Sequence, residues 1–164
     1  MRNETLLETF ENLPTKAKLL VIDHNDFNIV EDIDMYINYI NSPIEKIFIT
    51  AFLIYCKAFN KDVFIEPQIE IMCNKKLYIV DFEIKYDEMC NPNLKENFDL
   101  VIECDGYEFH QKTKKQVEYD NKREYDLKMA GYQILRFSGS EIYNNPYECI
   151  NRLFNYLEEF GYDK

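Results

Sequence analysis

Apolar positions follow a helical period in the first third of this chain and a period of two further on. Residues 2–12 and 28–40 carry apolar side chains at helical spacing, which predicts two short amphipathic helices. Between them, the apolar run 18–22 is consistent with a short strand. A Ser-Pro pair opens the next apolar segment and is a typical helix start, so we expect a third helix over 43–59.

The helix expected over 43–59 has an acidic side chain at the start of its apolar face. That face is formed by Ile49, Phe52, Cys56 and Phe59. Glu45 precedes Ile49 by four residues and therefore lies on the same face, where a charge is otherwise unfavourable. Glu45 is thus a candidate for a polar site.

From residue 63 the pattern indicates strands. Residues 63–73 and 77–88 alternate apolar and polar side chains and flank an Asn-Lys-Lys turn, which predicts a β-hairpin. The later elements are expected in the order strand 98–105, helix 112–130 ending at Gly131, strand 132–137, and a last helix from Pro146. The fold class is therefore α/β, with a mixed central sheet flanked by helices and a right-handed parallel crossover over 98–137.

The length of 164 residues suits one compact unit, divided into an N-terminal extension, 1–41, and a main domain, 42–164. Its five cysteines form no CxxC pair, and with no signal peptide they predict reduced thiols in a cytoplasmic protein. The longest apolar run, 47–56, is too short to span a bilayer, so no membrane association is expected. A net charge of −11 argues against a non-specific DNA coat, yet residues 110–116 hold three lysines and no acid.

Carboxylates in the expected sheet are the main chemical signal. Alternation places Glu103 and Asp105 on one side of their strand, and Asp81 lies in the middle of the neighbouring hairpin strand. If the two strands pair, Asp81 and Glu103 converge, and Glu45 could complete the group from across the layer. Such an oxygen-rich site suits Mg²⁺ or Mn²⁺, which would offset the cost of burying these charges.

The order of these residues resembles a known superfamily. Glu45, Asp81 and the run Glu-x-Asp-Gly-x-x-x-His from Glu103 to His110 are similar to the PD-(D/E)XK, restriction-endonuclease-like pattern. The nearest branch is the one related to very-short-patch-repair endonucleases. The resemblance spans about 43–155 and includes Asp120, Arg123, Leu127, Gly131 and Leu-Arg-Phe at 135–137.

This resemblance implies an αβββαβ core and metal-dependent hydrolysis of phosphodiester bonds in DNA, in repair, restriction or phage defence. Asp81 and Glu103 would be metal ligands for Mg²⁺ or Mn²⁺, with Glu45 as an auxiliary ligand. The lysine expected two residues after Glu103 is Asp105 instead. The residues implied as catalytic are Asp81, Glu103, Asp105 and His110. The missing lysine could be replaced by His110, Lys112 or Lys85.

Basic residues near this strand are candidates for nucleic-acid contacts, namely Lys112, Lys114, Lys115, Arg123 and Arg136. Plainer interpretations remain open, since the lysines could be solvated and Arg123 could form only a surface ion pair with Asp120. A second functional hypothesis is an inactive nuclease-fold module that binds nucleic acid or a protein partner. A partner protein or a homodimer could also supply DNA recognition.

Overall fold

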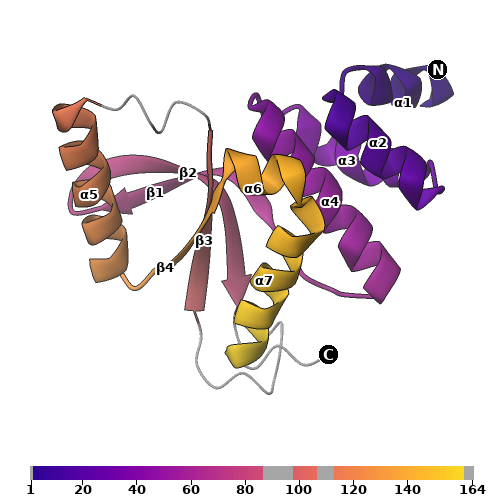
Figure 1. The fold of residues 1–164 in the computed structure, drawn as a ribbon. Helices are drawn as coiled ribbons and strands as arrows, with labels where there is room; N and C mark the ends of the chain where they lie inside the picture. The colour runs from indigo at the N-terminus through magenta and orange to yellow at the C-terminus, as the bar shows by residue number, and fades with distance from the viewer. Residues whose placement is uncertain (1, 87–97, 107–112, 161–164) are drawn as a thin grey trace.

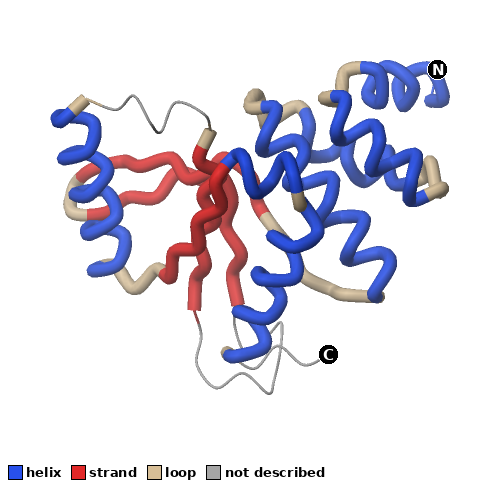
Figure 2. The backbone as a smooth tube through the Cα atoms, viewed as in Figure 1, coloured by secondary structure: helices blue, strands red, loops and turns tan. Residues whose placement is uncertain are grey.

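The computed structural model describes residues 2–86, 98–106 and 113–160. The first four helices are α1 (Arg2–Glu11), α2 (Thr15–His24), α3 (Ile29–Ile37) and α4 (Pro43–Phe59). The remaining elements are β1 (Glu66–Cys73), β2 (Lys76–Tyr86), β3 (Phe98–Asp105), α5 (Lys114–Met129), β4 (Gln133–Ser138), α6 (Gly139–Asn144) and α7 (Pro146–Glu159). Figures 1 and 2 show the sheet between α5 on one side and the other helices.

The N-terminal helices confirm two predictions and correct one. The helices predicted over 2–12 and 28–40 are α1 and α3. The strand expected over 18–22 is wrong, because these residues lie inside α2. The buried residues of α2 are Ala17, Leu20 and Val21, which is helical spacing, whereas Leu19 and Ile22 are exposed. The run looked like a strand because two of its apolar side chains face solvent.

Helix α4 begins and ends as its sequence predicts. Ser42 has extended backbone angles before Pro43, and Asn60 ends the helix in the left-handed conformation with φ 50°. Ile49 and Phe52 are fully buried. Phe59, expected on the same face, is 61% exposed because the helix runs past the edge of the core at its last turn.

The predicted α/β fold with a mixed sheet is confirmed. The strand order is β1-β2-β3-β4, with antiparallel pairing from β1 to β3 and parallel pairing of β3 with β4. From α4 onward the elements form the αβββαβ core followed by two helices. Helix α5 therefore connects the two parallel strands. It begins with a capping box of Thr113 and Gln116, and α6 begins with one of Ser138 and Glu141.

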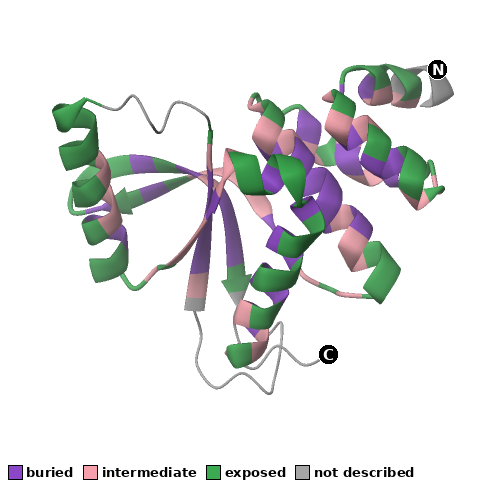
Figure 3. Cartoon of the chain, in the orientation of Figure 1, coloured by how far each residue is buried: buried purple, intermediate pink, exposed green. Residues whose placement is uncertain are grey.

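The two sides of the sheet differ in what covers them. On the side that we call the apolar face, Leu100, Ile102 and Cys104 join a large hydrophobic cluster with residues of α4, α6 and α7. On the other side, the carboxylate face, Val101 lies in a small cluster with Leu127 of α5. Figure 3 shows buried positions concentrated on β3 and α4, whereas α5 is mostly exposed.

Strand β2 changes sides along its length. Strict alternation predicted Tyr78, Val80, Phe82 and Ile84 on one face. Instead, the first two pack in the small cluster and the last two in the large one. The change falls at Asp81, next to the position in β1 where Gln68 has φ 54°. The β1–β2 ladder keeps one register on both sides of this position, with Pro67↔Phe82 and Ile69↔Val80, but skips the pair between them.

Among the described residues no helix is long and apolar enough to cross a membrane. The thiols of Cys56, Cys73, Cys104 and Cys149 are free, and Cys90 lies outside the described residues.

Candidate active site

The ladder between β2 and β3 ends just before Asp81 and Glu103. The antiparallel ladder ends at the pair Phe82↔Ile102, so Asp81 and Glu103 occupy the next opposed positions. The backbone N–H of Cys104 donates a hydrogen bond to Asp81 Oδ2 at 2.7 Å. A side-chain oxygen thus satisfies a backbone donor beyond the end of the ladder. Asp81 is thereby fixed just beyond the end of the ladder.

Asp81 is electrostatically coupled to two other carboxylates. Burial raises the pKa of Asp81 to about 7, and the negative charges of Glu103 and Glu45 add to the effect. The N–H of Cys104 and the guanidinium of Arg123 act in the opposite direction. The predicted convergence of Asp81 and Glu103 is therefore present as an interacting pair with Glu45 nearby.

The buried Glu103 has a cationic partner from α5. Arg123 Nη2 lies 2.6 Å from Glu103 Oε1 and also donates to the carbonyl oxygen of Ile79 at 2.6 Å. The side chains of Arg123 and Glu103 are 12% and 9% exposed, so Arg123 is not a surface residue. Burial disfavours the charged guanidinium, but the hydrogen bond to Glu103, together with the charges of Glu103 and Asp81, leaves the pKa of Arg123 above its usual value.

Glu45 is buried in the first turn of α4 and accepts a hydrogen bond from Gln68 Nε2 at 2.8 Å. Burial raises the pKa of its carboxyl, while hydrogen bonds from Ser42 and Gln68 lower it. Gln68 is a site neighbour that sequence reasoning missed. The available signal was Pro67, because a proline inside a strand marks irregular backbone.

Asp105 and Arg136 form a second ion pair at the end of the sheet. Arg136 Nη1 lies 3.3 Å from Asp105 Oδ1, and Arg136 Nη2 lies 3.6 Å from Glu124 of α5. The side chain of Asp105 remains 19% exposed. Gly139 allows α6 to start against this strand end, because a Cβ there would lie 3.0 Å from the carbonyl oxygen of Asp105.

The predicted basic residues occupy different places. Lys114 and Lys115 are exposed in the first turn of α5. Lys85 lies 3.1 Å from Glu83 Oε2 at the other end of β2, roughly 13 Å along the strand from Asp81. His110 and Lys112 lie outside the described residues.

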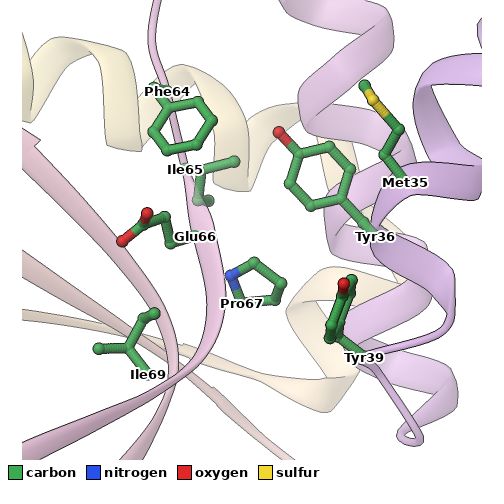
Figure 4. A pocket seen from close by; sticks show the side chains of 8 residues that line it. All are labelled: Met35, Tyr36, Tyr39, Phe64, Ile65, Glu66, Pro67 and Ile69. Carbon is green, nitrogen blue, oxygen red and sulfur yellow. The ribbon is translucent and has the colours of Figure 1, made fainter.

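An apolar hollow of about 370 Å³ adjoins this region. It lies between α3 and the start of β1, and Figure 4 shows Tyr36 and Tyr39 across from Pro67. Pro67 and Ile69, which both line it, flank Gln68 in the sequence. None of the predicted site residues that the structure describes lines this hollow, so the carboxylates form a separate polar site.

Among the described residues there is no group of three His, Cys, Asp or Glu side chains arranged to hold a metal ion. Asp81 and Glu103 instead provide two neighbouring carboxylates with mutual repulsion. This pair fits Mg²⁺, which is often bound through one or two carboxylates, substrate phosphate and water. A cation there would also relieve the repulsion that raises the pKa of Asp81.

The αβββαβ core, with carboxylates just beyond the end of the β2–β3 ladder, defines a restriction-endonuclease-like domain. The family model REase_MTES_1575, a restriction-endonuclease-like domain, matches residues 58–157, and the chain belongs to this family. No curated protein and no solved structure matches the chain. The family match covers Asp81, Glu103 and Arg123 but not Glu45.

Proposed function

We propose that this protein is a Mg²⁺- or Mn²⁺-dependent endonuclease that hydrolyses phosphodiester bonds in DNA, in repair, restriction or phage defence. The observation that carries the proposal is the Asp81–Glu103 pair just beyond the end of the β2–β3 ladder. Membership of a restriction-endonuclease-like family supports a nuclease. The pattern around Glu103 additionally favours the branch related to very-short-patch-repair endonucleases, with residues 1–41 as an extension to the nuclease-like domain.

In this proposal Asp81 and Glu103 hold the cation, and Glu45 and Asp105 assist at its border. Held there, Mg²⁺ or Mn²⁺ would supply polarisation of a phosphate oxygen and a lower pKa for a water molecule. The water oxygen forms a bond to phosphorus, the bond from phosphorus to the leaving oxygen breaks, and the proton of the water passes to a base. The leaving oxygen takes a proton from solvent. On sequence grounds the base is His110, and turnover should fall about a hundredfold in His110→Ala.

The direct test combines metal binding with cleavage. Mn²⁺ should bind the wild-type protein in calorimetry, Asp81→Ala should abolish this binding, and linear and plasmid DNA should be cut by the wild type but not by Asp81→Ala. Asp62→Ala is the matched control, since Asp62 is an exposed carboxylate in the segment after α4. Absence of Mn²⁺ binding to the wild type would remove the enzyme proposal.

Thermal unfolding provides a second measurement on the same site. A cation that binds only the folded protein stabilises it by about 2.7 kcal/mol at a hundredfold excess over its Kd. Glu103→Gln should lose this gain together with cleavage. If Glu103→Gln keeps the full Mn²⁺ increment, Glu103 is a structural carboxylate and the proposed ligand pair is wrong.

Two observations favour an alternative function. Arg123 neutralises Glu103 without a metal ion, and position 105 lacks the expected lysine. Both features suit an inactive module that binds nucleic acid or a protein partner. In that case the wild type and Asp81→Ala would bind DNA or the partner equally well, and neither would bind Mn²⁺. A partner protein or a second copy of the chain could also supply DNA recognition to an active enzyme, which size measurements with and without DNA would detect.

A further inference from the structure

The position that lacks a lysine lies close to a buried guanidinium. Asp105 stands two residues after Glu103, where the resemblance predicts a cation. Arg123 places its Nη2 atom 2.6 Å from Glu103 and is one of the charges that act on Asp81. The positive charge is therefore present at the carboxylate pair, but α5 supplies it rather than β3.

The geometry of Arg123 leaves it able to contact a further anion. Both of its hydrogen bonds to described residues, namely to Glu103 and to the carbonyl oxygen of Ile79, come from Nη2. A guanidinium carries five N–H donors in a fixed fork, so Nη1 and Nε retain donors suited to a phosphate. The bond to the backbone of β2 also fixes the guanidinium beside Asp81.

The other cations near the sheet fit this role less well. Arg136 contacts Asp105 and Glu124 at 3.3 and 3.6 Å and is more exposed than Arg123. Lys85 pairs with Glu83 at the opposite end of β2. Of the described cations, Arg123 alone bonds a member of the carboxylate pair.

We propose that Arg123 is the catalytic cation of this nuclease, taking the place of the absent lysine. It balances the charge of Glu103 in the free protein and donates to the scissile phosphate once substrate and cation are bound. Removing it should slow the chemical step without weakening cation binding, because the guanidinium and the cation compete for Glu103. The inference rests on the proposed nuclease function.

The experiment compares Arg123→Gln with Arg152→Gln, each assayed for kcat, KM and Mn²⁺ affinity. Arg152 is matched because it also bonds a carboxylate, Glu141 at 2.7 Å, and it packs over Phe137 on the apolar face. We expect kcat to fall about a hundredfold in Arg123→Gln, with KM nearly unchanged and Mn²⁺ affinity equal or higher. Arg152→Gln should match the wild type. Arg123→Lys keeps the charge but not the fork, so its kcat should lie between those of Arg123→Gln and the wild type.

Each other result overturns a defined part of the proposal. A wild-type kcat in folded Arg123→Gln, or a kcat of Arg123→Lys as low as that of a metal-ligand variant, overturns the catalytic role while the nuclease function stands. Loss of Mn²⁺ binding in Arg123→Gln would make Arg123 a structural support for Glu103. If Arg123→Gln does not fold, the same result in Arg123→Lys would mean the same. A wild type that neither cleaves DNA nor binds Mn²⁺ overturns the nuclease function and this inference together.

Discussion

The two faces of the central sheet share strands but use them differently. Alternate residues of β3 give Leu100, Ile102 and Cys104 to the apolar face, and Val101, Glu103 and Asp105 to the carboxylate face. Aromatic and aliphatic side chains of α4, α6 and α7 cover the apolar face. The carboxylate face is covered by α5, in which Asp126 and Leu127 are the buried residues.

Even the attachment of α5 is largely polar. Tyr78 on β2 donates a hydrogen bond of 2.7 Å to Asp126, which lowers the pKa of Asp126 and raises that of Tyr78 to about 12. Arg123, one turn earlier in α5, bonds Glu103 and the backbone of β2. Burial on one face therefore gives the fold its stability, while polar bonds on the other face position charged groups around an accessible strand end.

The largest effect on stability should follow truncation on the apolar face. Phe48 is fully buried, with its ring 5.5 Å from that of Phe82 and 5.6 Å from that of Phe137. Phe48→Ala should lower the free energy of unfolding by about 3–5 kcal/mol in urea titration. Phe59→Ala on the same helix, where the residue is 61% exposed, is the control and should cost far less. Equal losses would mean that α4 does not anchor the sheet as described.

The carboxylate face should make the stability of the protein depend on pH when divalent cations are chelated. The pKa of Asp81 is raised from 3.8 to about 7 in the folded protein. Its contribution to the free energy of unfolding is therefore fully present below about pH 4. This contribution is lost as pH rises through 7, because a buried carboxylate then ionises beside Glu103 and Glu45. At pH 8, Asp81→Asn should be more stable than the wild type, by on the order of 2 kcal/mol, and about equal to it at pH 4. Parallel stability curves for the two proteins would contradict the coupling.

The fold was largely predictable because burial leaves a period in the sequence. The alternation in 77–88 and 98–105 identified the paired strands, and the Ser-Pro start identified α4. Period reasoning failed where exposed residues are apolar, as in α2, and where the backbone is irregular, as at Gln68. The exposure of Leu19 in α2 does not follow from the residue types around it. The same holds for the positive φ of Gln68 in β1.

The candidate site was predictable in its acids but not in its cation. Strand alternation brought Asp81 and Glu103 together, since their partners on neighbouring strands follow from register. The partner of Glu103 is Arg123, and this contact depends on how α5 lies across the sheet. From the sequence, the spacing of Arg123 from Asp120 indicated a surface ion pair as the plain interpretation. The helix has a weak apolar stripe, so its orientation is set by contacts such as Tyr78 with Asp126 that no local pattern encodes.

A smaller effect should come from the lysines that open α5. Lys114 and Lys115 are exposed where this helix begins, on the side of the sheet that carries the carboxylates. Replacing both with Glu should weaken DNA binding and reduce the slope of log K against log salt by about 0.9 for each lost phosphate contact. Lys57→Glu, in the last turn of α4, is the control and should keep the wild-type slope. An unchanged slope in the double variant would place the DNA-binding surface elsewhere.

The smallest effect should belong to Glu45, the one acidic group that α4 contributes near the site. Its carboxylate already accepts a hydrogen bond from Gln68 and is held near Ser42, so it can modify the charge at Asp81 without binding the cation itself. Glu45→Gln keeps the shape and an acceptor oxygen. We expect Mn²⁺ affinity to fall by less than about tenfold and stability without metal to change by less than about 1 kcal/mol, because lost repulsion and lost hydrogen bonding oppose each other. Calorimetry and urea titration on Glu45→Gln and Asp81→Asn measure both quantities side by side. If Glu45→Gln abolishes Mn²⁺ binding as completely as Asp81→Asn, Glu45 is a primary ligand. The apolar-face helix would then supply part of the metal site, and the division of labour between the two faces would not hold.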